Sequence, residues 1–283
     1  MNQLQNKALL LTLNCSQWTA RKYDKSVSRE VESNHQAKDA GRYNKLLVPA
    51  ASLKPIANMI GKIRDYHESV TLPWMNEGQR VLPAKLYLEY TQQMRGMRDS
   101  FNALVDEFYN NYPTLIKEAR LKLGTMYDPG EYPPPDVIRG KFDLGFRFEP
   151  IPDAADFRVD IDADDVKAIR ADITRNISTQ QHDALQHCWG RLREVVSKIE
   201  ERLSDPDAIF RDSLIENARS LIKILPALNL LEDPELEAAR TAVEHRLCMI
   251  SPQRLRDDKA VRAQTAQAAS EILQRMQRYD VAA

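Results

Sequence analysis

Apolar side chains that alternate three and four residues apart run through most of this chain, and such spacing favours long helices over other folds. The longest stripe extends from Val166 to Leu203, roughly 38 residues or about 57 Å of helix. A second stripe covers Tyr87 to Phe108, and a third covers Leu53 to Val70. Runs of this length are typical of coiled coils. We therefore predict a mainly α protein, an elongated helical hairpin or coiled-coil bundle in which the two longest helices form the hairpin.

Composition argues against an all-β fold. The 283 residues include only 9 glycines, and the 15 prolines gather in a few places, whereas sandwiches and barrels need turn residues about every ten positions. With 43% hydrophobic and 29% charged residues, the chain has the composition of a folded protein. Its net charge of −1 supplies no overall attraction for nucleic acid or for an anionic membrane.

Two segments carry strand patterns instead of helical ones. Residues 8–18 are rich in leucine and threonine and lack a helical face. Apolar side chains also alternate with period two inside the proline-rich residues 124–152, at Phe142, Leu144, Phe146 and Phe148. We predict that this insertion pairs with a strand at residues 8–15 and forms a small two- or three-stranded element.

Glycine and proline mark several expected helix boundaries. Residues 19–40 are polar and favour an exposed helix that ends near Gly41. We expect Pro113 to kink or restart the helix that follows Pro83, and Gly124 to end it. Leu72-Pro73 and Leu82-Pro83 bracket a connection, because a residue before proline avoids the α conformation.

Later helices are expected where a capping residue precedes proline, at Asp205-Pro206, Asp233-Pro234 and Ser251-Pro252. We predict a single elongated helical domain, residues 1–283, within which residues 205–283 could form a C-terminal helical subdomain. The cysteines, Cys15, Cys188 and Cys248, are odd in number and widely separated, which indicates free thiols in a reducing compartment. The apolar run at residues 8–13 is too short to span a bilayer. We expect a cytoplasmic protein without membrane contact.

Candidate catalytic and metal-binding patterns are incomplete. Asp160-x-Asp162-x-Asp164-Asp165 begins like a calcium loop but lacks the glycine and glutamate that such a loop needs, so the carboxylates are better explained by a helix N-terminus. His182 and His187, beside Cys188, lack the spacing and the remaining ligands of a zinc site. No phosphate-binding loop or nucleophile motif is present. We expect no catalytic residue, cofactor or metal, and hence no enzyme.

Two segments could instead contact a partner. Residues 18–45 combine a local excess of basic side chains with aromatic ones, and could touch phosphates, although a solvated helix face explains them as well. Trp74 and Met75, together with the aromatic side chains of the proline-rich loop, could dock a protein or could equally pin loops to the helical body.

Several short motifs resemble an uncharacterised family of helical proteins carried by bacteriophages, prophages and plasmids, often encoded near MoxR-type AAA+ ATPases and von Willebrand factor A domain proteins. They span about residues 8–160 and comprise the leucine-rich strand leading to Trp18-x-x-Arg21-Lys22, Lys45-Leu46-Leu47, Thr71-Leu72-Pro73-Trp74, Gly78-x-Arg80-x-Leu82-Pro83, Tyr132-Pro133 and Phe148-x-Pro150-x-Pro152. None is a catalytic signature. The resemblance implies a mobile-element protein that acts through partners, in the host cytoplasm if phage-encoded, and it transfers no functional residues.

We therefore expect a non-enzymatic phage or mobile-element helical protein that binds a host or phage protein complex, self-associates as a homo-oligomer, or does both. Inhibition of a host defence system is one form this could take. The candidate partner-binding residues are Trp18, Arg21, Lys22, Trp74, Arg80, Phe146 and Phe148.

The alternative is a nucleic-acid-binding protein that uses two basic segments, residues 18–45 and residues 254–262 with Arg254, Arg256, Lys259 and Arg262. A divergent enzyme ranks third. Salt separates the first two hypotheses, because phosphate contacts weaken steeply as ionic strength rises, whereas an apolar interface barely changes.

Overall fold

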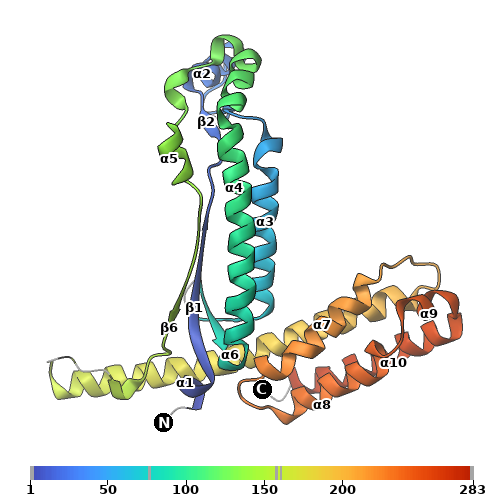
Figure 1. Ribbon diagram of the computed structural model, residues 1–283. Helices are drawn as coiled ribbons and strands as arrows, with labels where there is room; N and C mark the ends of the chain where they lie inside the picture. Colours follow the sequence, from blue (N-terminus) through green and yellow to red (C-terminus); the bar gives the residue numbers. More distant parts are fainter. Residues whose placement is uncertain (1–2, 76–77, 157–158, 160, 281–283) are drawn as a thin grey trace. The chain divides into compact units, whose positions relative to one another are not determined.

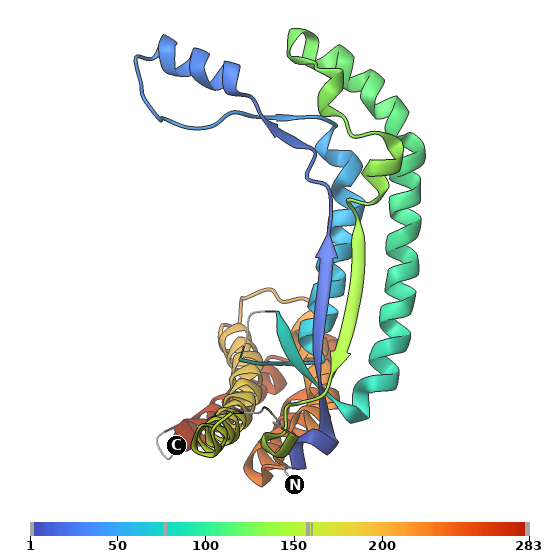
Figure 2. The same ribbon diagram turned by 90° about the vertical axis from the view of Figure 1, so that its left-hand side faces the viewer.

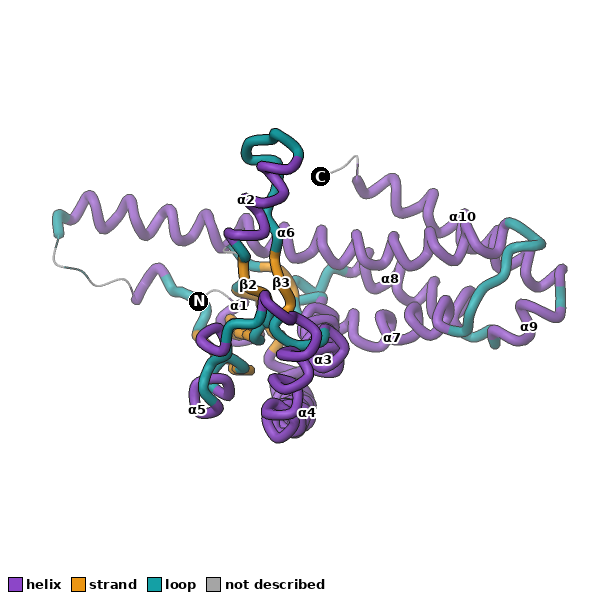
Figure 3. Tube along the Cα trace, turned by 90° about the horizontal axis from the view of Figure 1, so that it is seen from above, coloured by secondary structure: helices purple, strands orange, loops and turns teal. Residues whose placement is uncertain are grey.

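The computed structural model describes residues 3–75, 78–156, 159 and 161–280, and in this part of the chain helices predominate beside two small sheets (Figures 1 and 3). The predicted mainly α class with a small β element is confirmed. Among the helices described here, none is both long enough and apolar enough to cross a membrane.

The chain divides into two compact units. Unit 1 comprises residues 1–12, 68–88 and 148–283, and unit 2 comprises residues 13–67 and 89–147. We predicted a single elongated domain. Nothing in this division tests that prediction; the N-terminal segment and the proline-bracketed segment contribute side chains to the core of the C-terminal helices.

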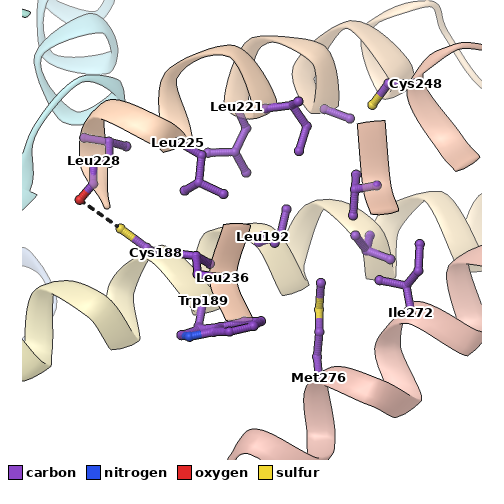
Figure 4. Close-up of a cluster of buried hydrophobic side chains, with 14 of the residues drawn as sticks. Cys188, Trp189, Leu192, Leu221, Leu225, Leu228, Leu236, Cys248, Ile272 and Met276 are labelled. Carbon is purple, nitrogen blue, oxygen red and sulfur yellow. Dashed lines mark hydrogen bonds between the residues drawn. The ribbon is translucent and has the colours of Figure 1, made fainter. Parts of the chain in front are cut away.

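The helices of unit 1 are α6 (Ala163–Ser204), α7 (Ser213–Leu228), α8 (Pro234–Val243), a π-helical turn (Glu244–Cys248), α9 (Pro252–Asp257) and α10 (Lys259–Asp280). α6 packs mainly against α10 and α7. Figure 4 shows side chains from these helices meeting in one core, among them Leu192, Leu225 and Ile272. The predicted C-terminal subdomain, residues 205–283, is thus packed along α6 within the same unit.

One sheet has the strand order β4 (Leu72–Pro73), β5 (Gln79–Pro83), β1 (Ala8–Ser16) and β6 (Asp143–Glu149), and α1 (Gln3–Lys7) precedes β1. In unit 1, β1 runs antiparallel to β5, with Leu10 opposite Val81. Both segments with strand patterns are strands, and they are neighbours in the sheet. β4 and β5 lie in what we predicted as a plain connection. They escaped the sequence pattern because both are short and each ends in proline, which usually argues against a strand.

Unit 2 contains α3 (Ala50–Ser69) as far as His67 and α4 (Tyr87–Leu123) from Glu89 onward. Within this unit, the two helices lie side by side (Figures 1 and 2). Tyr66 stacks on Tyr90 with 5.9 Å between ring centroids, and His67 Nδ1 lies 3.0 Å from the Tyr90 hydroxyl. The predicted seam of α3 is confirmed by the burial of Leu53, Ile56, Ile60, Ile63 and His67.

The helical hairpin differs from the predicted one. We expected the two longest helices to pair, but α4 pairs with α3, and the main partners of α6 are α10 and α7. The apolar stripes of these helices are compatible with both the predicted pairing and the observed one. α4 runs without a break through Pro113, although Gly124, at a φ of +54°, does end it. Left-handed backbone of this kind favours glycine.

A second, two-stranded sheet pairs β2 (Arg21–Tyr23) with β3 (Asn44–Leu46), and α2 (Lys25–Asn34) lies between them in sequence. The predicted helix over residues 19–40 is therefore wrong at both ends, because α2 covers only Lys25–Asn34. Its first residues are a strand because their partner lies more than twenty residues away, and local spacing does not reveal such a partner. Short helical turns (Ala84–Leu86, Gly124–Met126, Pro129–Glu131, Ala154–Asp156) and α5 (Pro135–Arg139) complete the described elements.

Two of the three predicted C-terminal helix starts are confirmed. Asp233 caps α8 by accepting from the Leu236 backbone N–H at 2.7 Å, and Ser251 caps α9. The start at Asp205-Pro206 is wrong, since Asp205 is the residue after α6 and α7 begins only at Ser213.

Candidate functional site

The two-stranded ribbon of unit 2 presents one exposed side. Residues directly opposite one another in an antiparallel pair share a face, and successive residues alternate between faces. Arg21 pairs with Leu46, and Tyr23 pairs with Asn44, so these four side chains lie on one face. All four are exposed, with 42% of Tyr23 and 43% of Leu46 accessible to solvent. Arg42 joins them, because its guanidinium lies 5.8 Å from the centre of the Tyr23 ring. We name this group, Arg21, Tyr23, Arg42, Asn44 and Leu46, the ribbon face.

The opposite face of the ribbon is anchored by a buried lysine. Lys45 is only 5% exposed, and its Nζ lies 2.7 Å from Glu131 Oε2 and 3.3 Å from Asp24 Oδ2. The same ammonium donates to the Met126 carbonyl oxygen at 2.8 Å. Burial opposes the charged form of Lys45, but the hydrogen bonds to Glu131 and Asp24 outweigh it and raise the pKa. A charged anchor therefore joins β3 to the segment that follows α4.

Asp24 also fixes the start of α2. Its Oδ1 accepts from the backbone N–H groups of Ser26 and Val27, both at 3.1 Å, and from the Ser26 hydroxyl at 2.7 Å. Ser28 donates its hydroxyl to the Asp24 carbonyl and accepts from the Tyr43 backbone N–H. Because one carboxylate serves both the helix cap and the Lys45 anchor, α2 and the ribbon are held as a single piece.

The ionisation of Asp24 predicts an acid-sensitive unit 2. Hydrogen bonds from the Ser26 side chain and the Val27 backbone, together with Lys45, lower the Asp24 pKa to about 2. A carboxyl group with a lowered pKa stabilises the fold above its ordinary pKa and loses this contribution as pH falls toward the folded value. We expect the melting temperature to fall between about pH 4 and pH 2. Circular dichroism melts would show a smaller fall in Asp24→Asn, and equal falls in both proteins would contradict the assignment.

Trp18, the first predicted partner-binding residue, is half-buried and packs against α4. Its ring makes edge contacts with Phe108 at 6.3 Å and Tyr112 at 5.8 Å between centroids. Trp18 thus packs the segment before the ribbon against α4. The next two predicted residues, Arg21 and Lys22, are exposed on β2.

The predicted residues of unit 1 are buried or half-buried. Trp74 is only 7% exposed and belongs to the apolar core, so it offers little area to a partner. Arg80 is half-buried, and it donates to the Thr71 hydroxyl at 2.6 Å and to the carbonyls of Thr71 and Glu68. Phe148 packs against Tyr87 at 5.0 Å.

The last predicted residue, Phe146, belongs to unit 2 and packs edge-on against Tyr90 at 5.9 Å, with the Arg98 guanidinium 6.0 Å from its ring. Like Phe148, it is half-buried. The alternation of aromatic side chains along β6 is thus used inside the fold, because aromatic side chains of α4 pack against it.

The basic segment at residues 254–262 is not a uniform cationic surface. Arg254 and Lys259 are exposed. Arg256 pairs with Asp212 and lies over the Phe210 ring, and Arg262 is 7% exposed and donates to backbone carbonyls. Arg262 was predicted to contact phosphate, but burial places its guanidinium out of reach of a polyanion.

The start of α6 carries most of the acidic cluster, and one of the three cysteines, Cys188, lies further along that helix. Asp160 of the acidic cluster lies outside the described residues, and Asp162 caps α6 through the Asp164 backbone N–H. Within the described ranges, no group of three or more His, Cys, Asp or Glu side chains could hold a metal ion. Cys188 and Cys248 are buried, and burial raises the pKa of both thiols, to about 12 for Cys188.

Comparison of the chain with protein-family models, with curated proteins and with solved structures gives no significant match. Sequence patterns found the basic and aromatic character of residues 18–45 but missed Leu46 and Glu131. Glu131 is recognisable only from the fold, since it meets Lys45 from a segment far along the chain.

Proposed function

We propose that this chain is a non-enzymatic interaction protein that binds a protein partner through the ribbon face of unit 2. The observation that supports this most is an exposed group of arginine, tyrosine and leucine side chains on a ribbon that a buried lysine holds in place. Tyrosine and arginine are the residues that protein interfaces favour at their energetic centres. Prior ordering of the ribbon reduces the conformational entropy that binding would cost.

The backbone of the ribbon supports the same proposal. In the part of the chain that the structure describes, β2 and β3 pair only with each other, so each is an edge strand. An extended segment of a partner can add to such an edge by main-chain hydrogen bonds, while neighbouring side chains select its sequence. A second copy of this chain could do the same, which accommodates self-association.

The resemblance to mobile-element proteins suggests a host or phage protein complex as the partner, and inhibition of a host defence system as one outcome. A second candidate function is nucleic-acid binding. The specific observation in its favour is that five cations in and beside the ribbon are exposed, namely Arg21, Lys22, Lys25, Arg29 and Arg42.

The test compares two variants of unit 2. Arg21→Glu with Tyr23→Ala removes the charge and the ring of the ribbon face, and Lys117→Glu with Leu121→Ala makes the same kinds of change at exposed positions of α4. After quantitative affinity capture identifies a partner, we expect the ribbon variant to bind it at least about tenfold more weakly, because interface centres contribute about 2 kcal/mol or more. The α4 variant should bind as the unaltered chain does.

Salt and labelled DNA decide between the two functions. If the ribbon binds a protein, its affinity for that partner should change little between about 50 and about 500 mM salt. Binding through phosphate contacts should weaken steeply over the same range. Partner capture unaffected by the ribbon variant would refute the proposal. Fluorescence anisotropy that shows salt-sensitive DNA binding, lost in the same variant, would replace it by nucleic-acid binding.

A further inference from the structure

A groove of about 310 Å³ runs beside α6 and α7 in unit 1, and no residue of the ribbon face lines it. Figure 1 shows the two helices adjacent along this stretch. The polar residues that line the groove are Ser69, Arg191, Glu194, Lys198, Asn217 and Ser220. Pockets that bind small molecules begin at about this volume and carry a few converging polar groups. The groove therefore has the size and lining of a small-ligand site.

Arg191 is the unusual member of this lining. It is half-buried beside the apolar stripe of α6, and its Nη1 is shielded from solvent and has no hydrogen-bond partner among the residues described. A buried donor without a partner is unfavourable, and a charged donor more so. Arg80, the neighbouring guanidinium, is in contrast used by Thr71 and Glu68. Arg191 thus retains donor capacity that the fold does not use.

The charges around Arg191 are not balanced by an adjacent buried acid. Burial lowers the pKa of Arg191 and of Arg80, and the positive charge of Arg191 lowers the Arg80 pKa further. His187, one turn earlier on α6, has a lowered pKa because of burial and of both arginines. The acids in range are Glu68 near Arg80 and Glu194 near Arg191.

Glu194 does not neutralise Arg191 by a direct ion pair in the described part of the chain. It is exposed, and its Oε1 lies 2.5 Å from Lys198 Nζ. Arg191 and Lys198 therefore flank the groove as two cations with one exposed carboxylate between them in sequence. An arrangement of this kind attracts a small anion that brings several acceptor oxygens.

We propose that this groove binds the phosphate group of a small phosphate monoester or of free phosphate, with Arg191 as the principal donor and Lys198 as a second cation at the rim. Phosphate suits the site because its oxygens can accept two N–H groups of one guanidinium while a lysine contributes a point charge. Ser220 and Asn217 on α7 line the opposite side and offer further polar contacts. The site is independent of the ribbon face, so either proposal can fail alone.

The experiment is calorimetric titration of the full chain with inorganic phosphate and with adenosine monophosphate, at constant ionic strength kept with chloride. Arg191→Met keeps an apolar stem, removes the unpaired donor and should not lower the melting temperature in phosphate-free buffer. We expect it to weaken binding of both ligands at least about tenfold. Lys223→Met removes one exposed cation of α7 that does not line the groove, and it should change the affinity less than about twofold.

Comparing the affinities for the two ligands shows whether the groove recognises a phosphorylated organic molecule or free phosphate. Tighter binding of adenosine monophosphate supports a phosphorylated organic ligand, and equal affinities support recognition of the oxyanion alone. The absence of saturable binding to the unaltered chain would overturn the proposal, as would equal affinities for Arg191→Met and the unaltered chain. If Arg191→Met fails to fold, Lys198→Met at the exposed rim serves instead, and we expect at least a threefold loss, about what one exposed charge contributes.

Discussion

Replacing Arg262 by methionine should lower the free energy of unfolding of unit 1 by about 3 to 5 kcal/mol. The guanidinium is 7% exposed and donates to the carbonyls of Leu203 at 3.2 Å, Arg202 and Ala208 at 2.8 Å each, and Asp205. The last carbonyls of a helix lack partners within it, and a cation there also meets the negative end of the helix dipole. Arg262, from α10, thus caps the end of α6. Methionine would leave these buried carbonyls unsatisfied.

Urea unfolding followed by circular dichroism measures this loss. Arg262→Lys keeps the charge, but a single ammonium cannot reach the carbonyls that the planar guanidinium reaches, so we expect an intermediate loss. Arg254→Met, at an exposed position of α9, should change stability by less than about 0.5 kcal/mol. Equal stabilities of Arg262→Met and Arg254→Met would show that the cap is unimportant.

Leu192→Ala should destabilise unit 1 by about 3 kcal/mol. Leu192 is fully buried on α6, and Figure 4 shows it in the core between side chains of α7 and α10. Truncation removes the transfer free energy of the lost methyl and methylene groups and leaves a cavity that three packed helices cannot fill completely. The same urea experiment measures the effect.

Ile209→Ala is the informative control for Leu192→Ala. Both are large aliphatic residues, but Ile209 is 92% exposed in the segment between α6 and α7. We expect its truncation to change stability by less than about 0.5 kcal/mol. A loss comparable to that of Leu192→Ala would mean that the helix predicted to start at Asp205-Pro206 forms after all.

The sequence predicted the region of the candidate site but not its structure. Basic and aromatic side chains in residues 18–45 indicated a binding surface, and Arg21 and Lys22 are indeed exposed. Their helix was wrong, because the register of β2 with β3 depends on a partner strand and not on local spacing. Lys45 counted as one more surface cation, yet Glu131 and Asp24 enclose it.

The phosphate groove could not be predicted from local sequence patterns, because its lining residues come from segments far apart in the chain. Local spacing gives Arg191 no special role, since an arginine on a long charged helix is usually solvated. In the fold, α7 lies beside the part of α6 that carries Arg191, whose Nη1 is shielded from solvent, and Arg80 on β5 lies within electrostatic range of Arg191.

By itself, the sequence determined the mainly α class, the seams of α3, α4 and α6, and the caps that begin α8 and α9, because helix periodicity and capping act within a few residues. Tertiary structure decided which seams meet, that α4 packs with α3 while α6 packs with α10 and α7, and which polar side chains become buried. An apolar stripe specifies that a helix must be covered but does not specify by what, and the burial of Lys45, Arg191 and Arg262 follows from that choice of partner.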